Sequence, residues 1–297
     1  FICPPSVAAT LQPLLAWKRQ LGFTTHLVTT DETGTQNTSI LAWLRNAYNT
    51  WDVPPEYVVL VGDVNGSYII PTFYKPATLP PGDMNETDHG YTLLDGTDYF
   101  PDLAIGRLSF QSLMQLQTIV SKIIHYESEP DASSNWTEQA LMLSVVQNYY
   151  NSYTSGRETV MAVREKLLDY EYATVDTFIE PYNSNHSQLM NYINAGKGFV
   201  NYRGFGAPNY WSGGYGYMME ISDINNLSNG FKLPMVTSIV CGGGDFGDPF
   251  YDSCFGETWL NAGSPACPKG AIGFIGPSEH DTKTWFNNAM DMGIYHG

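Results

Sequence analysis

One cysteine of this sequence stands between a short apolar segment and a run of glycines. The apolar and β-branched residues 236–240 lead directly into Cys241, and Gly242, Gly243 and Gly244 follow. A short apolar run is typical of a buried parallel strand, and open α/β sheets place ligands and catalytic groups at the carboxyl ends of their strands. Cys241 is therefore a candidate nucleophile, and the backbone N–H of Gly242 is a candidate donor to an oxyanion.

A cysteine nucleophile needs a base close by, because a thiol near its ordinary pKa is mostly protonated at neutral pH. A second strand-then-glycine segment, residues 198–206, is the natural neighbour for that base. Phe205 lies there between Gly204 and Gly206, and a benzyl group has neither a lone pair nor an exchangeable proton. His280, which follows the apolar segment 270–275, is the alternative base at the same edge of the sheet.

The composition excludes several classes of protein. The chain has 297 residues, of which 43% are hydrophobic and 15% charged, so it can bury a sizeable core and is not a disordered segment. Its net charge of −16, with 14 Lys and Arg residues, argues against nucleic acid and anionic membranes as partners. No apolar run reaches the length of a transmembrane helix, and no signal peptide is recognisable.

The sequence gives weaker indications of where the protein is located and of whether its cysteines form a disulfide. Asn-x-Ser/Thr triplets, which are glycosylation acceptors in secreted proteins, favour an extracellular setting and begin at Asn37, Asn65, Asn85, Asn135, Asn185 and Asn226. Four cysteines are too few for a disulfide framework in a chain of this length. Cys254 and Cys267 are close enough in sequence to form one disulfide, with two free buried thiols as the alternative.

Helical and strand patterns alternate along the chain, which predicts βαβ units, a mainly parallel sheet and an α/β fold. Residues 1–131 are expected to form an amino-terminal subdomain with helices at 8–20, 38–48 and 112–127 and strands at 23–29, 57–63 and 91–94. Residues 132–297 are expected to form a second subdomain with helices at 155–170, 187–195 and 257–262 and strands at 140–146, 173–178, 198–202, 233–241 and 270–275.

Closely spaced acidic residues lie within the expected amino-terminal subdomain. Asp95, Asp98 and Asp102 are separated by Gly, Tyr, Phe and Pro residues. Ca²⁺ takes six to eight oxygen ligands, which such carboxylates and the neighbouring backbone carbonyls can supply. The segment is therefore either a calcium-binding loop or an ordinary acidic turn.

The order of these segments resembles the gingipain family of cysteine peptidases, the C25-type peptidases of the caspase-like clan. The similarity covers the strand order, the helix with Trp17-Lys-Arg, the acidic loop, the Ile105-Gly-Arg turn and the cysteine block from Cys241 to Glu257. It implies a caspase-like three-layer sandwich with two subdomains. The family's Gly-His-Gly is Gly204-Phe205-Gly206 in this chain, and the family's catalytic acid falls on or near Gln147.

The resemblance also implies a structural Ca²⁺ ion. The family's ligand positions correspond here to a set in which every acidic position is occupied, namely Asp63, Asp95, Asp98, the Phe100 carbonyl and Asp102. The expected calcium ligands are all present, whereas Phe205 and Gln147 are neutral residues at two catalytic positions. This combination favours a domain that keeps the family's fold but has lost its proton-transfer groups.

Three functions follow as hypotheses. The first is a secreted pseudopeptidase that serves as a structural or binding module, with proteins or peptides as partners, possible surface-protein subunits among them. The second is an active cysteine endopeptidase in which Cys241 works with a relocated base such as His280. The third is a domain that binds a peptide or glycan, with Cys241 only a buried thiol.

Overall fold

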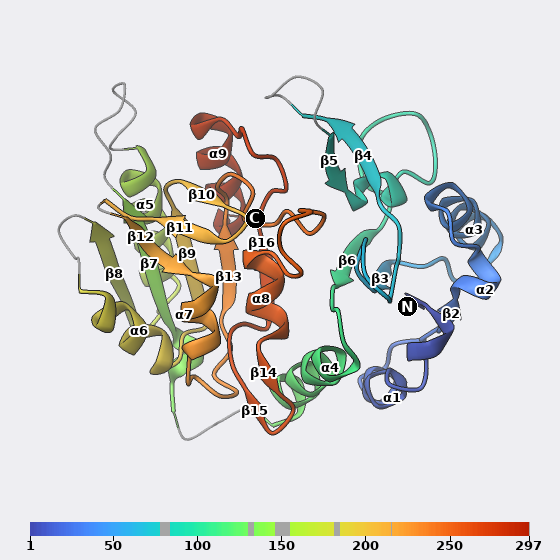
Figure 1. The fold of residues 1–297 in the computed structure, drawn as a ribbon, viewed down its shortest axis with the longest axis horizontal. Helices are drawn as coiled ribbons and strands as arrows, with labels where there is room; N and C mark the ends of the chain where they lie inside the picture. The colour runs from blue at the N-terminus through green and yellow to red at the C-terminus, as the bar shows by residue number, and fades with distance from the viewer. Residues whose placement is uncertain (78–83, 130–133, 146–154, 181–184, 215, 297) are drawn as a thin grey trace.

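The computed structural model describes residues 1–77, 84–129, 134–145, 155–180, 185–214 and 216–296. Two α/β halves lie side by side, each with its own parallel sheet and its own helices (Figure 1). The fold class expected from the sequence, α/β with mainly parallel sheets flanked by helices, is confirmed.

The amino-terminal half contains a four-stranded sheet whose neighbouring strands are all parallel, in the order β2 (Val28–Thr29), β1 (Ile2–Cys3), β3 (Tyr57–Val61) and β6 (Ala104–Leu108). Its helices are η1 (Pro5–Val7), α1 (Gln12–Gln20), α2 (Thr30–Thr33), α3 (Asn37–Thr50), η2 (Asp88–Thr92) and α4 (Leu113–Ser128). A hairpin of β4 (Phe73–Pro76) and β5 (Met84–Thr87) extends from it.

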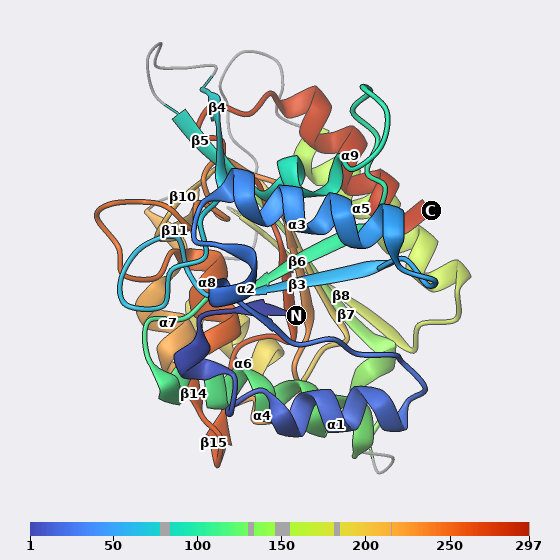
Figure 2. The same ribbon diagram turned by 90° about the vertical axis from the view of Figure 1, so that its right-hand side faces the viewer.

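Alternation along β3 gives this sheet two buried faces. Val58 and Leu60 pack in one core cluster with Ile40 and Leu44 of α3. Val61 packs in a second cluster with residues of α1 and α4. Because successive side chains of a strand point to opposite faces, one strand serves both clusters. Figure 2 shows α3 on one side of the strands and α1 and α4 on the other.

The carboxyl-terminal half contains a five-stranded parallel sheet in the order β16 (Gly273–Ile275), β13 (Met235–Ser238), β9 (Phe199–Arg203), β7 (Gln139–Val145) and β8 (Thr174–Glu180). Its helices are η3 (Trp136–Glu138), α5 (Ser155–Asp169), α6 (His186–Asn194), α7 (Ile221–Asn226), α8 (Phe255–Asn261) and α9 (Thr284–His296). Two small antiparallel sheets complete it, formed by β10 (Gly206–Ala207), β11 (Tyr210–Ser212) and β12 (Tyr217–Glu220), and by β14 (Gly263–Ser264) and β15 (Cys267–Pro268).

Several of the expected strands were wrong in extent or type, and the strand expected at 233–241 ends at Ser238, before Cys241. Within residues 23–29, only Val28–Thr29 form a strand. The neighbouring strand β1 is two residues long, so it has no further backbone groups with which a longer strand could pair. Residues 91–94 form no strand, because residues 88–92 form a 3-10 turn that buries Tyr91, whose hydroxyl donates to the Pro71 carbonyl at 2.7 Å. Helix α9 and the small sheet β10-β11-β12 were not expected from the sequence.

Four aromatic rings fill the core beneath the end of β9. Trp211 stacks on Tyr202 with ring centroids 4.7 Å apart, and it also contacts Phe255 and Trp259 at 4.9 and 5.9 Å. The Trp211 indole N–H donates to Ser238 Oγ at 2.8 Å. All four rings are fully buried, so the small sheet that carries Trp211 is anchored to the large sheet.

No helix among the described residues is both long enough and apolar enough to cross a membrane.

Helix α9 meets the large sheet through buried polar groups. Asn201 Nδ2 donates to Asp291 Oδ2 at 2.9 Å, while Asn201 Oδ1 and Asp291 Oδ1 are buried without a hydrogen-bond partner. Burial raises the pKa of Asp291 to about 6, against the opposing effects of the Asn201 hydrogen bond and the Arg203 charge. Protonation of Asp291 therefore supplies a hydrogen-bond donor at a place where Asn201 Oδ1 and Asp291 Oδ1 have none.

We predict that Asp291→Asn removes a pH dependence of stability. The folded-state pKa of about 6 lies above the ordinary value of 3.8, so the stability contributed by the protonated carboxyl is lost as pH rises through this window. The variant's free energy of unfolding should gain on the order of 3 kcal/mol relative to the parent between pH 4 and 7. Urea unfolding at four pH values measures this, with the exposed Asp52→Asn as control. Parallel curves for parent and variant would contradict the assignment.

Candidate active site

Parallel register brings three loops together at one edge of the large sheet. Ser238 of β13 is opposite Tyr202 of β9, and Thr237 is opposite Ile275 of β16. The three strands therefore end at the same level, and the segments that follow them meet there. A Cβ built on Gly206, just after β9, would lie 3.2 Å from the Cys241 carbonyl oxygen.

Two backbone hydrogen bonds clamp the cysteine loop (residues 239–254, between β13 and α8) to the His280 loop (residues 276–283, between β16 and α9). Gly242 N–H donates to the Glu279 carbonyl at 2.9 Å, and Gly244 N–H donates to the Pro277 carbonyl at 3.0 Å. A Cβ on Gly244 would lie 2.4 Å from the Gly276 carbonyl oxygen, so only glycine allows this approach. The expectation that the Gly242 N–H serves an oxyanion is wrong in this conformation, because Glu279 already occupies that donor.

Cys241 is half-buried, and its sulfur lies 3.3 Å from the hydroxyl oxygen of Thr282. Asn287 Nδ2 donates to the same hydroxyl oxygen at 2.7 Å, and either the thiol or the hydroxyl can be the donor in the contact between Cys241 and Thr282. A threonine hydroxyl is too weak a base to remove the thiol proton at neutral pH. Thr282 carries no recognisable motif, and the sequence did not indicate it.

Phe205 lies in the loop after β9 that faces the cysteine. Its carbonyl accepts from the Tyr202 hydroxyl at 2.8 Å and from the Ser212 N–H at 2.9 Å, so its backbone is fixed. Its side chain is 46% exposed and offers no proton acceptor. Gln147, the expected position of the missing acid, lies outside the described residues.

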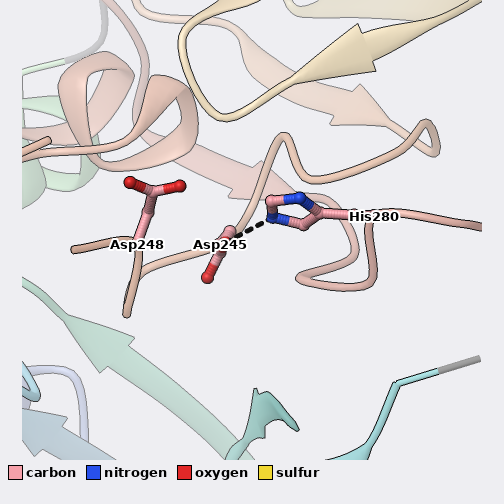
Figure 3. A group of neighbouring side chains, drawn as sticks. All are labelled: Asp245, Asp248 and His280. Atoms are coloured by element: carbon pink, nitrogen blue, oxygen red, sulfur yellow. Dashed lines mark hydrogen bonds and ion pairs between the residues drawn. The ribbon is translucent and has the colours of Figure 1, made fainter. Parts of the chain in front are cut away.

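The imidazole ring of His280 lies against Gly242 of the cysteine loop. A Cβ on Gly242 would lie 3.2 and 3.3 Å from Cδ2 and Nε2 of the His280 ring. Nε2 lies 2.6 Å from Oδ2 of Asp245, which orients the ring (Figure 3). Within the described ranges, the one side chain hydrogen-bonded to the Cys241 sulfur is Thr282, so the imidazole makes no direct bond to it.

Further carboxylates surround His280. The ligand atoms of Asp245, Asp248 and His280 all lie within 4.8 Å of one another, and both aspartates are buried. Glu86 reaches the same place from β5, where burial, a hydrogen bond with Asp245, and the charges of Asp245 and Asp248 raise the pKa of Glu86 to about 7. Asp245 and Asp248 were noticed in the sequence only as neighbours of the cysteine, and no sequence signal placed Glu86 here.

The five-residue calcium set does not converge on one point. Tyr57 and Val61 of β3 are opposite Ala104 and Leu108 of β6, so Asp63 follows one end of this ladder and Asp102 precedes the other. The ladder alone spans roughly 13 Å, whereas ligands of one Ca²⁺ ion lie within about 5 Å of one another. A single site that includes Asp63 and the acidic loop is therefore wrong.

Asp63 belongs instead to the junction of the halves. It is buried and accepts a short hydrogen bond from Gln111 Nε2. Burial and the charge of Asp63 raise the pKa of Glu257 to about 8, and the Ser109 hydroxyl also bonds to Glu257. The acidic loop is self-contained: Asp102 Oδ2 accepts from the backbone N–H groups of Leu94 and Asp95 at 2.7 and 2.9 Å.

The cysteines are all free thiols, so the alternative of a disulfide between Cys254 and Cys267 is not realised. Cys254 is buried at the start of α8, and Cys267 is exposed in β15. Burial raises the pKa of the Cys254 thiol well above its ordinary range and raises the pKa of Cys3 to about 11.

Comparison with known proteins places this geometry among peptidases. The family model described as peptidase family C25 matches residues 1–297. Lys-gingipain of Porphyromonas gingivalis is 28% identical over 273 residues, which are 90% of this chain and 15% of that protein. Gingipain R2 of the same organism is 25% identical over 270 residues, covering 89% of this chain and 34% of that protein. The chain thus spans a minor part of these relatives.

Solved structures show the same fold. The complex of the pro- and mature domains of Porphyromonas gingivalis RgpB superimposes with a TM-score of 0.84 at 23% identity, covering 100% of this chain and 68% of that one. The Arg-specific cysteine proteinase gingipain R gives 0.84 at 22% identity, with 99% and 66% covered. The caspase-like architecture expected from the resemblance is thereby confirmed.

We predict that two of the four thiols react quickly with Ellman's reagent in the native protein, namely Cys241 and Cys267, because Cys3 and Cys254 are buried and hard to ionise. Cys241→Ser and Cys267→Ser should each remove one fast equivalent, and Cys254→Ser should remove none. In guanidinium chloride all four should react. Two reactive thiols after denaturation would contradict the absence of a disulfide.

Proposed function

The chain belongs to peptidase family C25, and we propose that it is a gingipain-fold domain without peptidase turnover that acts as a binding or structural module. One observation carries this proposal: the Cys241 sulfur is hydrogen-bonded to the hydroxyl of Thr282, while Phe205 stands in the loop where the base is expected.

The proposal follows from where protons must go in acyl transfer. The thiol must lose its proton before attack, and the leaving amine must gain one. Thr282, the hydrogen-bond partner of the sulfur, is too weak a base to take this proton, and Phe205 has no group that can accept it. Loss of the base from a nucleophile–base pair lowers turnover by about 10⁴-fold or more, so the remaining groups leave the protein far below an active peptidase.

A protein or peptide is the partner that the relatives favour. One structural neighbour is a complex between a pro-domain and a mature domain, and the relatives are named for Lys or Arg specificity. Exposed aromatic side chains near the site, such as Trp285 and Phe286 on α9, provide apolar contact area for such a partner. We propose an extracellular placement, with other surface-protein subunits as possible partners, on the basis of the same relatives and the Asn-x-Ser/Thr triplets.

The second candidate function is a cysteine endopeptidase with a relocated base. It is favoured by the contact of the His280 ring with the Gly242 backbone and by the 2.6 Å bond from His280 to Asp245, which is the orienting partner such a base requires. In this arrangement His280 would have to rotate toward the sulfur, since its bond in this structure is to Asp245.

Alkylation kinetics separate the two functions. We predict that iodoacetamide modifies Cys241 at a rate that rises about tenfold per pH unit from pH 5 to 8, because only the small thiolate fraction reacts. The measurement uses the Cys267→Ser background to silence the exposed thiol. His280→Ala should leave the profile unchanged, as should the matched control His186→Ala.

A rate that is flat with pH, and becomes steep in His280→Ala alone, would establish His280 as the base. Cleavage of a Lys or Arg peptide by the unmodified chain, abolished by Cys241→Ser, would likewise overturn the proposal.

We also propose that the acidic loop binds structural Ca²⁺ without Asp63. Asp95, Asp98 and Asp102 with the Phe100 carbonyl supply oxygen ligands from one short loop, in which Gly96 has a φ of 66°, and their carboxylates would have to draw closer together to share one ion. Added Ca²⁺ should raise the melting temperature of the metal-free protein by about 5 °C, since it binds only the folded state. Asp98→Asn should remove most of this increase, whereas Asp52→Asn should not; an equal increase in both variants would exclude the loop.

A further inference from the structure

A second group of metal-ligating side chains joins the two halves of the protein. It consists of Asp245 and Asp248 in the cysteine loop, His280 in the following loop, and Glu86 from β5 of the other half. We call these four residues the Asp-His cluster. Figure 3 shows the side chains of Asp245 and His280 in contact and Asp248 beside them.

The spacing is that of a metal site in need of a small contraction. One ligand atom each from Asp245, Asp248 and His280 lies within 4.8 Å of the others. Ligands of a tetrahedral Zn²⁺ ion, at about 2.0–2.2 Å from the metal, lie about 3.3–3.6 Å apart. Side-chain rotations that bring the ligand atoms about 1 Å closer together would close that difference.

Glu86 is held against the same loop by its own anchors. A Cβ on Gly247 would lie 2.3 Å from Cδ and Oε1 of Glu86, so glycine makes room for this carboxylate. The Ser278 hydroxyl donates to the Glu86 carbonyl at 2.7 Å, and Asn85 Nδ2 donates to Glu279 Oε2 at 2.7 Å. Hydrogen bonds on both sides of Glu86 thus fix β5 to the His280 loop.

Three carboxylates share this space, and the basic side chain in contact with them is the imidazole of His280. Within the described ranges, neither lysine nor arginine forms an ion pair with Glu86, Asp245 or Asp248. Arg107 passes nearby over the Phe246 ring at 5.0 Å, but its guanidinium is paired with Asp88 at 2.7 Å. Buried carboxylates in contact repel one another unless protons or a cation neutralise them.

We infer that the Asp-His cluster binds a divalent transition-metal ion of the zinc class. The imidazole selects this class, because Ca²⁺ and Mg²⁺ prefer oxygen ligands alone, whereas Zn²⁺ accepts nitrogen together with carboxylate oxygen. One histidine and three carboxylates provide the four ligands of a tetrahedral site.

The metal would connect the two halves and occupy His280. Glu86 belongs to the hairpin of the amino-terminal half, and the other three ligands belong to the carboxyl-terminal half. Binding therefore stabilises their junction by mass action. With the metal bound, Asp245 and His280 are both ligands of the ion. Asp245 then no longer orients His280 as a base, and His280 cannot accept the proton of Cys241.

Zinc titration tests the inference. ZnCl₂ added to the metal-free chain, followed by isothermal titration calorimetry, should show one equivalent bound, and thermal melting should show a higher midpoint. Asp248→Asn keeps an oxygen for the Phe250 N–H, which donates to Asp248 Oδ1 at 2.7 Å, but removes a charged ligand, so it should weaken binding at least about tenfold. Glu86→Gln should weaken binding similarly without altering the cysteine loop.

The matched control is His186→Ala, which removes a histidine paired with Asp223 at 3.2 Å on the surface, away from the cluster. Its zinc affinity should equal that of the parent. Absence of a stoichiometric site, equal affinity in Asp248→Asn, Glu86→Gln and the parent, or Ca²⁺ binding as tightly as Zn²⁺ at this site would each overturn the inference. Melting of each variant without metal confirms that it is folded.

Discussion

The site depends on two backbone hydrogen bonds between the cysteine loop and the His280 loop. Gly242 and Gly244 donate to carbonyls of the His280 loop, and the contact of Gly244 with the Gly276 carbonyl leaves no room for a side chain. This connection places Cys241 beside Thr282 and Asp245 beside His280. The same hydrogen bonds that position the thiol also occupy the Gly242 amide, so one loop conformation sets both the place of the thiol and the backbone donors left free beside it.

The junction of the halves is unusually acidic in its interior. Asp63 and Glu257 form one buried carboxylate pair, and Glu86 with Asp245 and Asp248 forms another group. The buried Lys122 pairs with none of these carboxylates and instead donates to the Leu260 carbonyl at the end of α8 at 2.6 Å. Ionised carboxylates in contact repel one another, so the stability of this junction depends on pH.

Much of the framework could be predicted from the sequence. The apolar run before Cys241 indicated the buried strand β13, although this strand ends at Ser238. The interpretation of Gly204-Phe205-Gly206 as a site without its base stays a prediction. Directions of side chains and the register between distant strands could not be predicted. Asp63 and Asp102 flank the two strands of one ladder, and only the parallel register shows that they lie at opposite ends. Thr282 and Glu86 reach the site through tertiary contacts that leave no local pattern.

The stacked rings below β9 give the molecule an optical property. Trp211 lies between Tyr202 and Phe255, within 5.9 Å of Trp259, and its indole is bonded to Ser238 of the strand that leads to the cysteine loop. Aromatic rings held in one fixed packing contribute to the near-ultraviolet circular dichroism of a folded protein. A shift of the strand ends would change this packing, which makes that signal a label-free reporter of movement at the sheet edge.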